Sequence, residues 1–425
     1  MMSTSTPRVG LGLHPDRDYL ERVIPVLERE VEILEVAPET TWALDETGAL
    51  ITNDYHRRFL AIGERLGLPF IAHGVGLSPG SAGDGPRRAR WLARMAGDQR
   101  LFNYHWYTDH LGATVLDGLE MTLPIGLPMT ADVAAIVRAR LCEMQRVVPR
   151  VGLENTAIYF VLGDPLAEPG FLAQILGDQH HLLLDLHNLH TMAENLGFDP
   201  LAWLARLDLS RVIEIHLAGG RDSEPQWLPS RRSLRVDSHD DHVPAPVWAL
   251  FEQVLPRCPA LGAVIVERME GTLAPGDELA LADELRRART MVHQLHRPGA
   301  STSLPAAPPA LDPHALAAQL EHERALAAVL RAPDPVAALA RAPASLQAAL
   351  AGVDPDGLRL AALFITRLRF ERVQHGDLAA ARHFDDAPAE FAAVFRRYLA
   401  EVAPTAAFAQ DEGALYRRWR RLPGT

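Results

Sequence analysis

The chain has very few cysteines and lacks the apolar segments of secreted or membrane proteins. Only Cys142 and Cys258 occur in 425 residues, too few for a disulfide framework or a thiolate zinc site, so we expect two buried, reduced thiols in helices. The segment MMSTSTPRVG at the start contains no apolar core of a secretory signal. No uncharged apolar run reaches the roughly 18 residues of a membrane span. We therefore expect a cytoplasmic protein with no membrane partner.

Basic residues are also in the minority. The 42 Lys and Arg stand against 54 Asp and Glu, which gives a net charge of −12, and an acidic chain repels the nucleic-acid backbone. Composition therefore predicts no nucleic-acid partner. A dinucleotide-binding fingerprint is missing too, because the segment GLGLH at residues 10–14 lacks the third glycine. The hydrophobic fraction of 48% predicts a packed core.

Short apolar runs alternate with segments of helical spacing from residue 7 to about residue 298. Most of these runs are continuously apolar, which is typical of a parallel sheet buried on both faces. About eight repeats favour a (β/α)₈ barrel of the TIM type over an open doubly wound sheet. The expected strands cover residues 8–13, 31–36, 69–75, 101–107, 151–154, 181–186, 212–217 and 263–267, and the clearest expected helices cover 16–30, 54–66, 131–148 and 245–255.

The composition changes after the barrel segment. Residues 299–313 are rich in Pro, Ala and Ser and are typical of a linker. Beyond them, Ala- and Leu-rich stretches with helical period recur without strand-like runs between them. We predict a catalytic barrel over residues 1–298, a linker over 299–313 and a smaller all-α domain over 314–425. The expected helices of that domain cover residues 315–330, 335–351, 358–373 and 388–402.

Histidines and carboxylates stand at or just beyond the ends of the apolar runs. The carboxyl ends of the strands are where a (β/α)₈ barrel assembles its chemistry, and a carboxylate in line with a buried strand is costly unless it is paired or metal-bound. The pattern predicts a site for more than one metal, and its nitrogen and oxygen ligands suit iron, manganese or zinc equally. The candidate ligands are His73, His110, Glu154, Asp185, His216, Asp237, His239 and Glu267.

A second group of polar residues surrounds these candidates. Asn188 is a further ligand candidate, and we expect His187, His190 and Asn155 to bind substrate or to orient neighbouring ligands. Asp237 and His239 are two residues apart, so in an extended segment they could chelate one ion. The same alternation places Glu214 on the strand face of His216.

The motifs together resemble one family. The match covers about residues 8–295 and resembles the multinuclear non-haem iron-dependent oxidative enzymes, the relatives of the methanobactin-maturation oxidase and of cysteine-tailoring peptide enzymes. The motifs that carry it are GLGLH, EVAPE, HGVGLSPG, TDHLG, GLEN, LDLHN, IHLAGG, DSHDDHV and VIVER.

The resemblance implies a xylose-isomerase-like barrel that holds two or three irons of mixed Fe(II) and Fe(III) state and uses O₂ as co-substrate. It carries the ligand role to the eight candidates above and to Asn188. It also places the chemistry on Glu267, Asp237 and His239. His187 stands where the family often has asparagine, and Met269 where the family often has an acidic residue.

The C-terminal segment resembles the small helical partner proteins that accompany these enzymes and help to recognise the precursor peptide. The likeness rests on Arg369-Phe370-Glu371, Phe384, Phe391, Phe395 and Tyr398. The resemblance therefore implies a fused enzyme and partner, with a precursor peptide as substrate, and it allows a homodimer.

The predicted function is iron- and O₂-dependent oxidative modification of a ribosomally synthesised precursor peptide, at cysteine, in peptide natural-product biosynthesis. Two alternatives stay open from the residues. The same barrel and metal site would serve a metal-dependent phosphodiesterase or sugar isomerase, and a non-enzymatic peptide- or metal-binding module would need no turnover.

Overall fold

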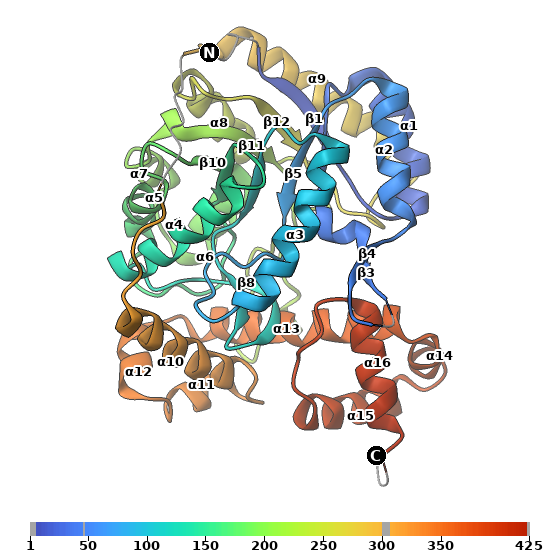
Figure 1. The fold of residues 1–425 in the computed structure, drawn as a ribbon, viewed down its shortest axis with the longest axis vertical. Coiled ribbons are helices and arrows are strands. Elements are labelled where there is room, and N and C mark those ends of the chain that lie inside the picture. The colour runs from blue at the N-terminus through green and yellow to red at the C-terminus, as the bar shows by residue number, and fades with distance from the viewer. Residues whose placement is uncertain (1–5, 46, 300–306, 423–425) are drawn as a thin grey trace.

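The computed structural model describes residues 6–45, 47–299 and 307–422. Residues 300–306 of the predicted linker and the first five residues of the N-terminal segment lie outside the described residues. Eight parallel strands close a barrel in the order β1-β12-β11-β10-β9-β6-β5-β2, so the predicted TIM barrel is confirmed; Figure 1 shows the barrel with helices around it. The barrel strands are β1 (Arg8–Leu13), β2 (Ile33–Val36), β5 (Phe70–Gly74), β6 (Tyr107–His110), β9 (Val151–Glu154), β10 (His181–Asp185), β11 (Val212–Leu217) and β12 (Ala263–Val266).

Helices surround the barrel and connect its strands. Several of them begin with a side-chain cap: Asp16 accepts a hydrogen bond from Tyr19 N, and Thr130 accepts one from Val133 N. These helices are α1 (Arg17–Glu30), α2 (Asp54–Leu66), α3 (Gly85–Phe102), α4 (Ala131–Gln145), α5 (Glu168–Leu176), α6 (Leu186–Leu196), α7 (Pro200–Leu204), α8 (Ala245–Val254) and α9 (Asp277–Leu295).

The prediction of a strand over residues 101–107 is wrong. Helix α3 continues through Phe102 and ends at Asn103, whose φ of 51° is left-handed, and the strand begins only at Tyr107. Trp91, Met95 and Phe102 are buried on one side of α3. The aromatic residues of the predicted strand are therefore divided: Phe102 belongs to helix α3 and Tyr107 to strand β6.

Both cysteines are buried and free, as expected for reduced thiols. Cys142 lies in α4. Cys258 lies just beyond the short 3₁₀ helix η5 (Leu255–Arg257), so its expected place in a helix is wrong.

Two antiparallel hairpins extend from the barrel, one after β2 and one after β6. They consist of β3 (Trp42–Leu44) with β4 (Leu50–Thr52), and of β7 (Ala113–Leu116) with β8 (Leu119–Ile125). Neither hairpin was predicted. Both lie in connections that follow the carboxyl end of a barrel strand, where loops of a (β/α)₈ barrel carry function.

The C-terminal region is helical in the residues described. Helix α13 crosses beneath the barrel in Figure 1 and joins two groups of helices, α10–α12 and α14–α16. The expected helix over residues 335–351 is two short helices. The elements are α10 (Pro313–Leu330), α11 (Pro335–Leu339), α12 (Ala344–Ala349), α13 (Pro355–Gly376), α14 (Leu378–Asp386), α15 (Pro388–Glu401) and α16 (Ala409–Arg420).

The helical region docks on the loops at the carboxyl ends of the barrel strands. The Glu323 carboxylate on α10 accepts hydrogen bonds from Ala82 N at 2.7 Å and Asp117 N at 3.2 Å. Arg232, in the loop after β11, donates to Asp354 at 2.5 Å just before α13. These loops follow β5, β6 and β11, so the helical region covers the face on which a barrel places its active site.

Two hydrophobic clusters divide the helical region. The barrel core continues into α10, α12 and the first half of α13 through residues such as Leu326 and Ile365. The rest of the region has a separate cluster made of Val373, Ala380, Phe391, Phe395, Tyr398, Tyr416 and Trp419. Helices α10–α12 therefore share a core with the barrel, while α14–α16 pack on their own. Within the described ranges, no helix combines the length and the apolar character needed to cross a membrane.

Candidate metal centre

All eight candidate ligands lie at the carboxyl ends of the barrel strands or in the loops beyond them. His73, His110, Glu154 and Asp185 come from the last two residues of four strands. Four overlapping groups of ligand atoms, each within 4.8 Å, involve seven of these eight residues, all but Asp237. We call the whole set the His–carboxylate cluster: His73, His110, Glu154, Asp185, His216, Asp237, His239 and Glu267.

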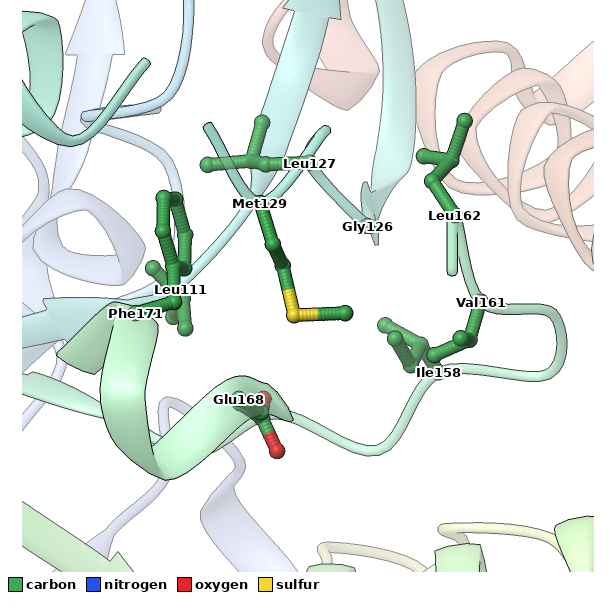
Figure 2. A pocket seen from close by; sticks show the side chains of 9 residues that line it. All are labelled: Leu111, Gly126, Leu127, Met129, Ile158, Val161, Leu162, Glu168 and Phe171. Atoms are coloured by element: carbon green, nitrogen blue, oxygen red, sulfur yellow. The ribbon is translucent and has the colours of Figure 1, made fainter. Parts of the chain in front are cut away.

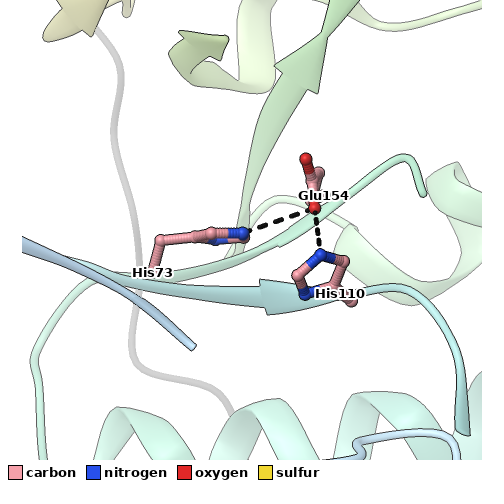
Figure 3. Close-up of side chains that lie close together, drawn as sticks. All are labelled: His73, His110 and Glu154. Carbon is pink, nitrogen blue, oxygen red and sulfur yellow. Dashed lines mark ion pairs between the residues drawn. The ribbon is translucent and has the colours of Figure 1, made fainter. Parts of the chain in front are cut away.

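Glu154 joins two histidines at one side of the cluster (Figure 3). Its Oε2 lies 3.4 Å from His73 Nε2 and 3.1 Å from His110 Nε2. The other ring nitrogen of His110, Nδ1, lies 3.1 Å from the carbonyl oxygen of Gly74, which can only accept a proton. In a neutral ring, His110 Nε2 therefore presents a lone pair to a carboxylate, an arrangement that a bound metal ion would stabilise.

The pKa values of these histidines follow from burial and charge. Burial lowers the pKa of His110 despite the nearby Glu154 carboxylate, which favours the neutral ring. For His73, burial also opposes the charge, but the Glu154 carboxylate outweighs it and raises the pKa to about 10. One positive charge is thus already favoured beside Glu154 when no ion is there.

His216 occupies the centre of the cluster and is fully buried. Its Nδ1 lies 3.1 Å from Glu267 Oε2, and 3.8 Å from both Glu154 Oε1 and Asp185 Oδ2. Two atoms bound at about 2.1 Å to one ion lie about 3 Å apart when they meet it at a right angle. The distances from His216 Nδ1 to these three carboxylate oxygens therefore fit atoms that bind the same metal ion.

A third part of the cluster comes from the loop before α8. His239 Nε2 lies 2.6 Å from Asp237 Oδ1 and 3.7 Å from Glu267 Oε2. The backbone of His239 is left-handed, with a φ of 48°, a conformation that few residues other than glycine adopt and that is common at functional sites. The strained turn points the imidazole back toward Glu267.

The atoms that face one another in the cluster are those left without hydrogen-bond partners. Buried polar groups in proteins are almost always satisfied, so a cluster of unsatisfied ones calls for an ion or ligand. Burial, together with Glu154, also raises the pKa of Asp185 well above its ordinary value. The unpartnered atoms are Glu154 Oε2, Asp185 Oδ2, Asn188 Oδ1, His216 Nδ1, Asp237 Oδ1, His239 Nε2 and Glu267 Oε2. This donor set of imidazoles and carboxylates fits iron, manganese or zinc.

Two asparagines hold the carboxylates in place. Asn155 donates to the Asp185 carbonyl at 2.8 Å and accepts from Asp185 N at 2.9 Å, so it ties the ends of β9 and β10 together. Asn188 donates from Nδ2 to Glu154 Oε1 at 3.2 Å and keeps Oδ1 free of hydrogen bonds. Asn188 is therefore placed as a ligand candidate, while a substrate-binding role for Asn155 stays a prediction.

His187 and His190 both lie on α6 but differ in their distance from the cluster. His187 Nε2 lies 3.7 Å from Asp237 Oδ1, and its ring centroid lies 5.9 Å from that of His239. Burial lowers the pKa of His187 to about 4, which keeps the ring neutral. His190 belongs to none of the four groups of ligand atoms found among the described residues, and its predicted substrate role stays a prediction.

Sequence reasoning missed Glu35 as a site residue, and it placed Glu214 on the strand face of His216 without giving it a role in the site. The two carboxylates and His216 form one of the four groups of ligand atoms. Glu35 Oε2 lies 3.0 Å from His216 Nε2. Glu35 interrupts the apolar strand β2 one residue before its end, and that signal in the EVAPE motif could have identified it.

An apolar pocket opens beside the cluster (Figure 2). Its wall includes Leu111, which follows His110 and donates from its main-chain nitrogen to the Glu154 carbonyl at 3.0 Å. Met129 points into the middle of the pocket in Figure 2, and Glu168 lies at one edge. The pocket is lined by Leu111, Gly126, Leu127, Met129, Ile158, Val161, Leu162, Glu168 and Phe171.

The architecture is that of a TIM-barrel enzyme whose strand ends present a candidate metal centre. Residues 8–293 match the family model described as "RiPP precursor modification enzyme MbnB/TglH/ChrH", where a RiPP is a ribosomally synthesised and post-translationally modified peptide. The chain belongs to this family, and the resemblance seen in its motifs is confirmed.

The relatives match between half and two thirds of the chain. A UPF0276 protein of Caulobacter vibrioides is 33% identical over 285 residues, which cover 66% of this chain and 93% of that protein. A UPF0276 protein of Rhizorhabdus wittichii is 36% identical over 227 residues, covering 53% of this chain and 77% of that protein. Among solved structures, a xylose isomerase domain protein from Planctomyces limnophilus has a TM-score of 0.43 and 15% identity, covering 68% of this chain and 98% of that one.

Proposed function

We propose that this chain is an iron- and O₂-dependent oxidative enzyme that modifies a precursor peptide at a cysteine. The observation that carries the proposal is the convergence of unpartnered, buried imidazole and carboxylate atoms from separate barrel strands in the His–carboxylate cluster. Membership of a peptide-modifying family supports a peptide as the substrate.

Iron held by the cluster would supply one-electron redox chemistry with O₂ as co-substrate. The chain's own residues would do the rest. Glu154 and His216 each face two parts of the cluster and would hold the ions close together. Asp237, His239 and Glu267 are partly exposed, with side chains 15–23% accessible. We assign to these three the contact with substrate and the acceptance of the cysteine thiol proton.

The helical region would recognise the peptide. Helix α13 lies across the mouth of the barrel, and an apolar groove runs between it and the 3₁₀ helix η4 (Pro225–Trp227) in the loop after β11. Trp227 lies in the connection between β11 and α8 that also carries Asp237 and His239, so a peptide in the groove would lie beside that loop. The groove is lined by Trp227, Leu363, Phe364, Thr366, Arg367, Phe370 and Phe395.

The test is anaerobic loading of the full chain with Fe(II), followed by metal analysis and O₂ uptake with a cysteine-containing peptide encoded beside the gene. We expect two or three irons per chain, O₂ consumption that depends on the peptide, and a mass change that is lost when the peptide cysteine is replaced by serine. Zinc-loaded protein is the control and should bind metal without consuming O₂. Fewer than one metal per chain would defeat the proposal, and hydrolysis of a phosphodiester without O₂ uptake would support the hydrolase alternative.

A further inference from the structure

Two buried carboxylates lie beneath the His–carboxylate cluster, inside the barrel. Glu35 is 4% exposed and Glu214 is fully buried. Both face the ring nitrogen of His216 that points away from the rest of the cluster: Nε2 lies 3.0 Å from Glu35 Oε2 and 3.5 Å from Glu214 Oε1. Two carboxylates with so little contact with water are costly to keep, so their position calls for a role.

Glu214 also connects to a second histidine of the cluster. Its Oε2 accepts a hydrogen bond from Trp106 Nε1 at 2.8 Å and lies 3.4 Å from Thr108 Oγ1. The same Thr108 hydroxyl lies 3.0 Å from His73 Nδ1. His73 and His216, which sit on different strands, are therefore linked below the cluster through Thr108 and Glu214.

The three histidines nearest Glu154 share one arrangement. Each turns one ring nitrogen toward a carboxylate of the cluster and the other toward the barrel: His73 Nδ1 toward Thr108, His110 Nδ1 toward the Gly74 carbonyl, and His216 Nε2 toward Glu35. A hydrogen bond to the distal nitrogen fixes which nitrogen carries the proton and which is free to bind a metal.

We propose that Glu35, Glu214 and Thr108 are positioning residues, a hydrogen-bonding layer that fixes the rings of His216 and His73 for metal binding. Glu35 accepts the Nε2 proton of His216 and leaves Nδ1 for the metal. Thr108 accepts a hydrogen bond from His73 Nδ1 and donates its own hydroxyl hydrogen to Glu214, so the two rings are set together. This inference rests on the proposed function, because it requires the cluster to bind metal.

The experiment measures Co(II) affinity of the full-length chain by competition with a chelator, together with the visible spectrum of bound Co(II). We expect Glu35→Ala to weaken binding by about 10- to 100-fold and to shift the spectrum. Glu35→Gln keeps an oxygen that can accept the His216 proton, so it should restore most of the affinity. Thr108→Val has the same shape without the hydroxyl and should also weaken binding. Glu168→Gln, a buried carboxylate hydrogen-bonded to Trp203 instead of a histidine, is the control and should bind as the wild type does.

The possible outcomes separate a failure of the proposed metal centre from a failure of the hydrogen-bonding layer. A wild type that binds no Co(II) would overturn the metal centre and this layer together. A wild type that binds Co(II), with Glu35→Ala and Thr108→Val unchanged in affinity and spectrum, would overturn the layer alone. Equal losses in Glu35→Ala and Glu35→Gln would also overturn it, because charge and not the ring hydrogen bond would then matter. If Glu35→Ala fails to fold, the two isosteric variants still decide: a loss in Thr108→Val with near wild-type affinity in Glu35→Gln supports the layer.

Discussion

The ring of Phe364 on α13 packs against the ring of Tyr159 in the loop after β9, with centroids 5.1 Å apart. The Tyr159 hydroxyl in turn accepts a hydrogen bond from the main-chain nitrogen of Asp237 at 3.2 Å. Tyr159 thus touches both the helical region and the cluster. A displacement of α13 should therefore reach Asp237 through one side chain.

Replacement of Gly357 by alanine should displace α13. A Cβ at this position would lie 1.8 Å from the Tyr159 carbonyl oxygen, whereas a Cβ at Gly170 in α5 would meet nothing within 4 Å. We expect Gly357→Ala to lower kcat/KM for the peptide by at least about tenfold and to lower Tm, since neither backbone can yield without loss of packing. Gly170→Ala should be as stable as the wild type or more stable by about 0.4–1 kcal/mol. Wild-type activity in Gly357→Ala would show that the close contact of α13 with the barrel is not needed.

Truncation of the groove aromatics should weaken peptide binding selectively. Trp227 and Phe370 line the groove, and aromatic side chains dominate such interfaces, with losses of about 2 kcal/mol or more on change to alanine. Trp227→Ala and Phe370→Ala should each raise KM for the peptide about 30-fold, with iron content unchanged. Leu378→Ala, which removes an apolar side chain that is 73% exposed outside the groove, is the matched control. An unchanged KM in both groove variants would place recognition elsewhere.

Removal of one central ligand should lower metal content without unfolding the barrel. Glu154, Asp185 and His216 come from three adjacent strands and form one of the groups of ligand atoms. Each change to alanine should release at least one ion per chain, as measured by metal analysis, while circular dichroism stays that of the wild type, because barrel stability lies mostly in the packed interior and the opposite face. The exposed Glu252→Ala should keep all its metal. Full occupancy in all three ligand variants would contradict the assignment.

Stability should depend on pH through Glu168. Burial raises the pKa of Glu168 from 4.5 to about 7, although Trp203 donates a hydrogen bond to it. The folded chain then holds a proton that the unfolded chain releases, so the free energy of unfolding falls as pH rises from about 4.5 to 7. Glu168→Gln removes this dependence and should gain up to about 3 kcal/mol relative to the wild type across that window. Urea unfolding at several pH values measures it, with the exposed Glu194→Gln as control, and parallel curves for Glu168→Gln and the wild type would refute it.

The sequence predicted the barrel and its strand ends well because both depend on local patterns. Glu154 and Asp185 each follow a continuously apolar run, and a carboxylate in line with a buried strand is unusual enough to be recognised in the sequence. Glu35 lies inside its strand, with Val36 after it, so it did not stand out as a strand-end carboxylate and was missed. Its partner His216 lies 181 residues away, and no local pattern reveals that contact.

The docking of the helical region could not be predicted for the same reason. Composition indicated helices beyond residue 313, yet the face on which they settle is set by long-range contacts such as Glu323 with Ala82. Helical period cannot say whether an apolar face packs on its own neighbours or on the barrel. Here the apolar face of α10 packs on the barrel core, whereas that of α15 packs on neighbouring helices.

The covalent continuity of barrel and helical region has a consequence for kinetics. Two separate proteins come apart when they are diluted, and their joint activity then falls faster than the concentration of either. In this chain α13 remains at the barrel mouth at any dilution, because a tether keeps its effective concentration fixed. The specific activity should therefore not change with enzyme concentration, and no excess of a second protein should be required to reach it.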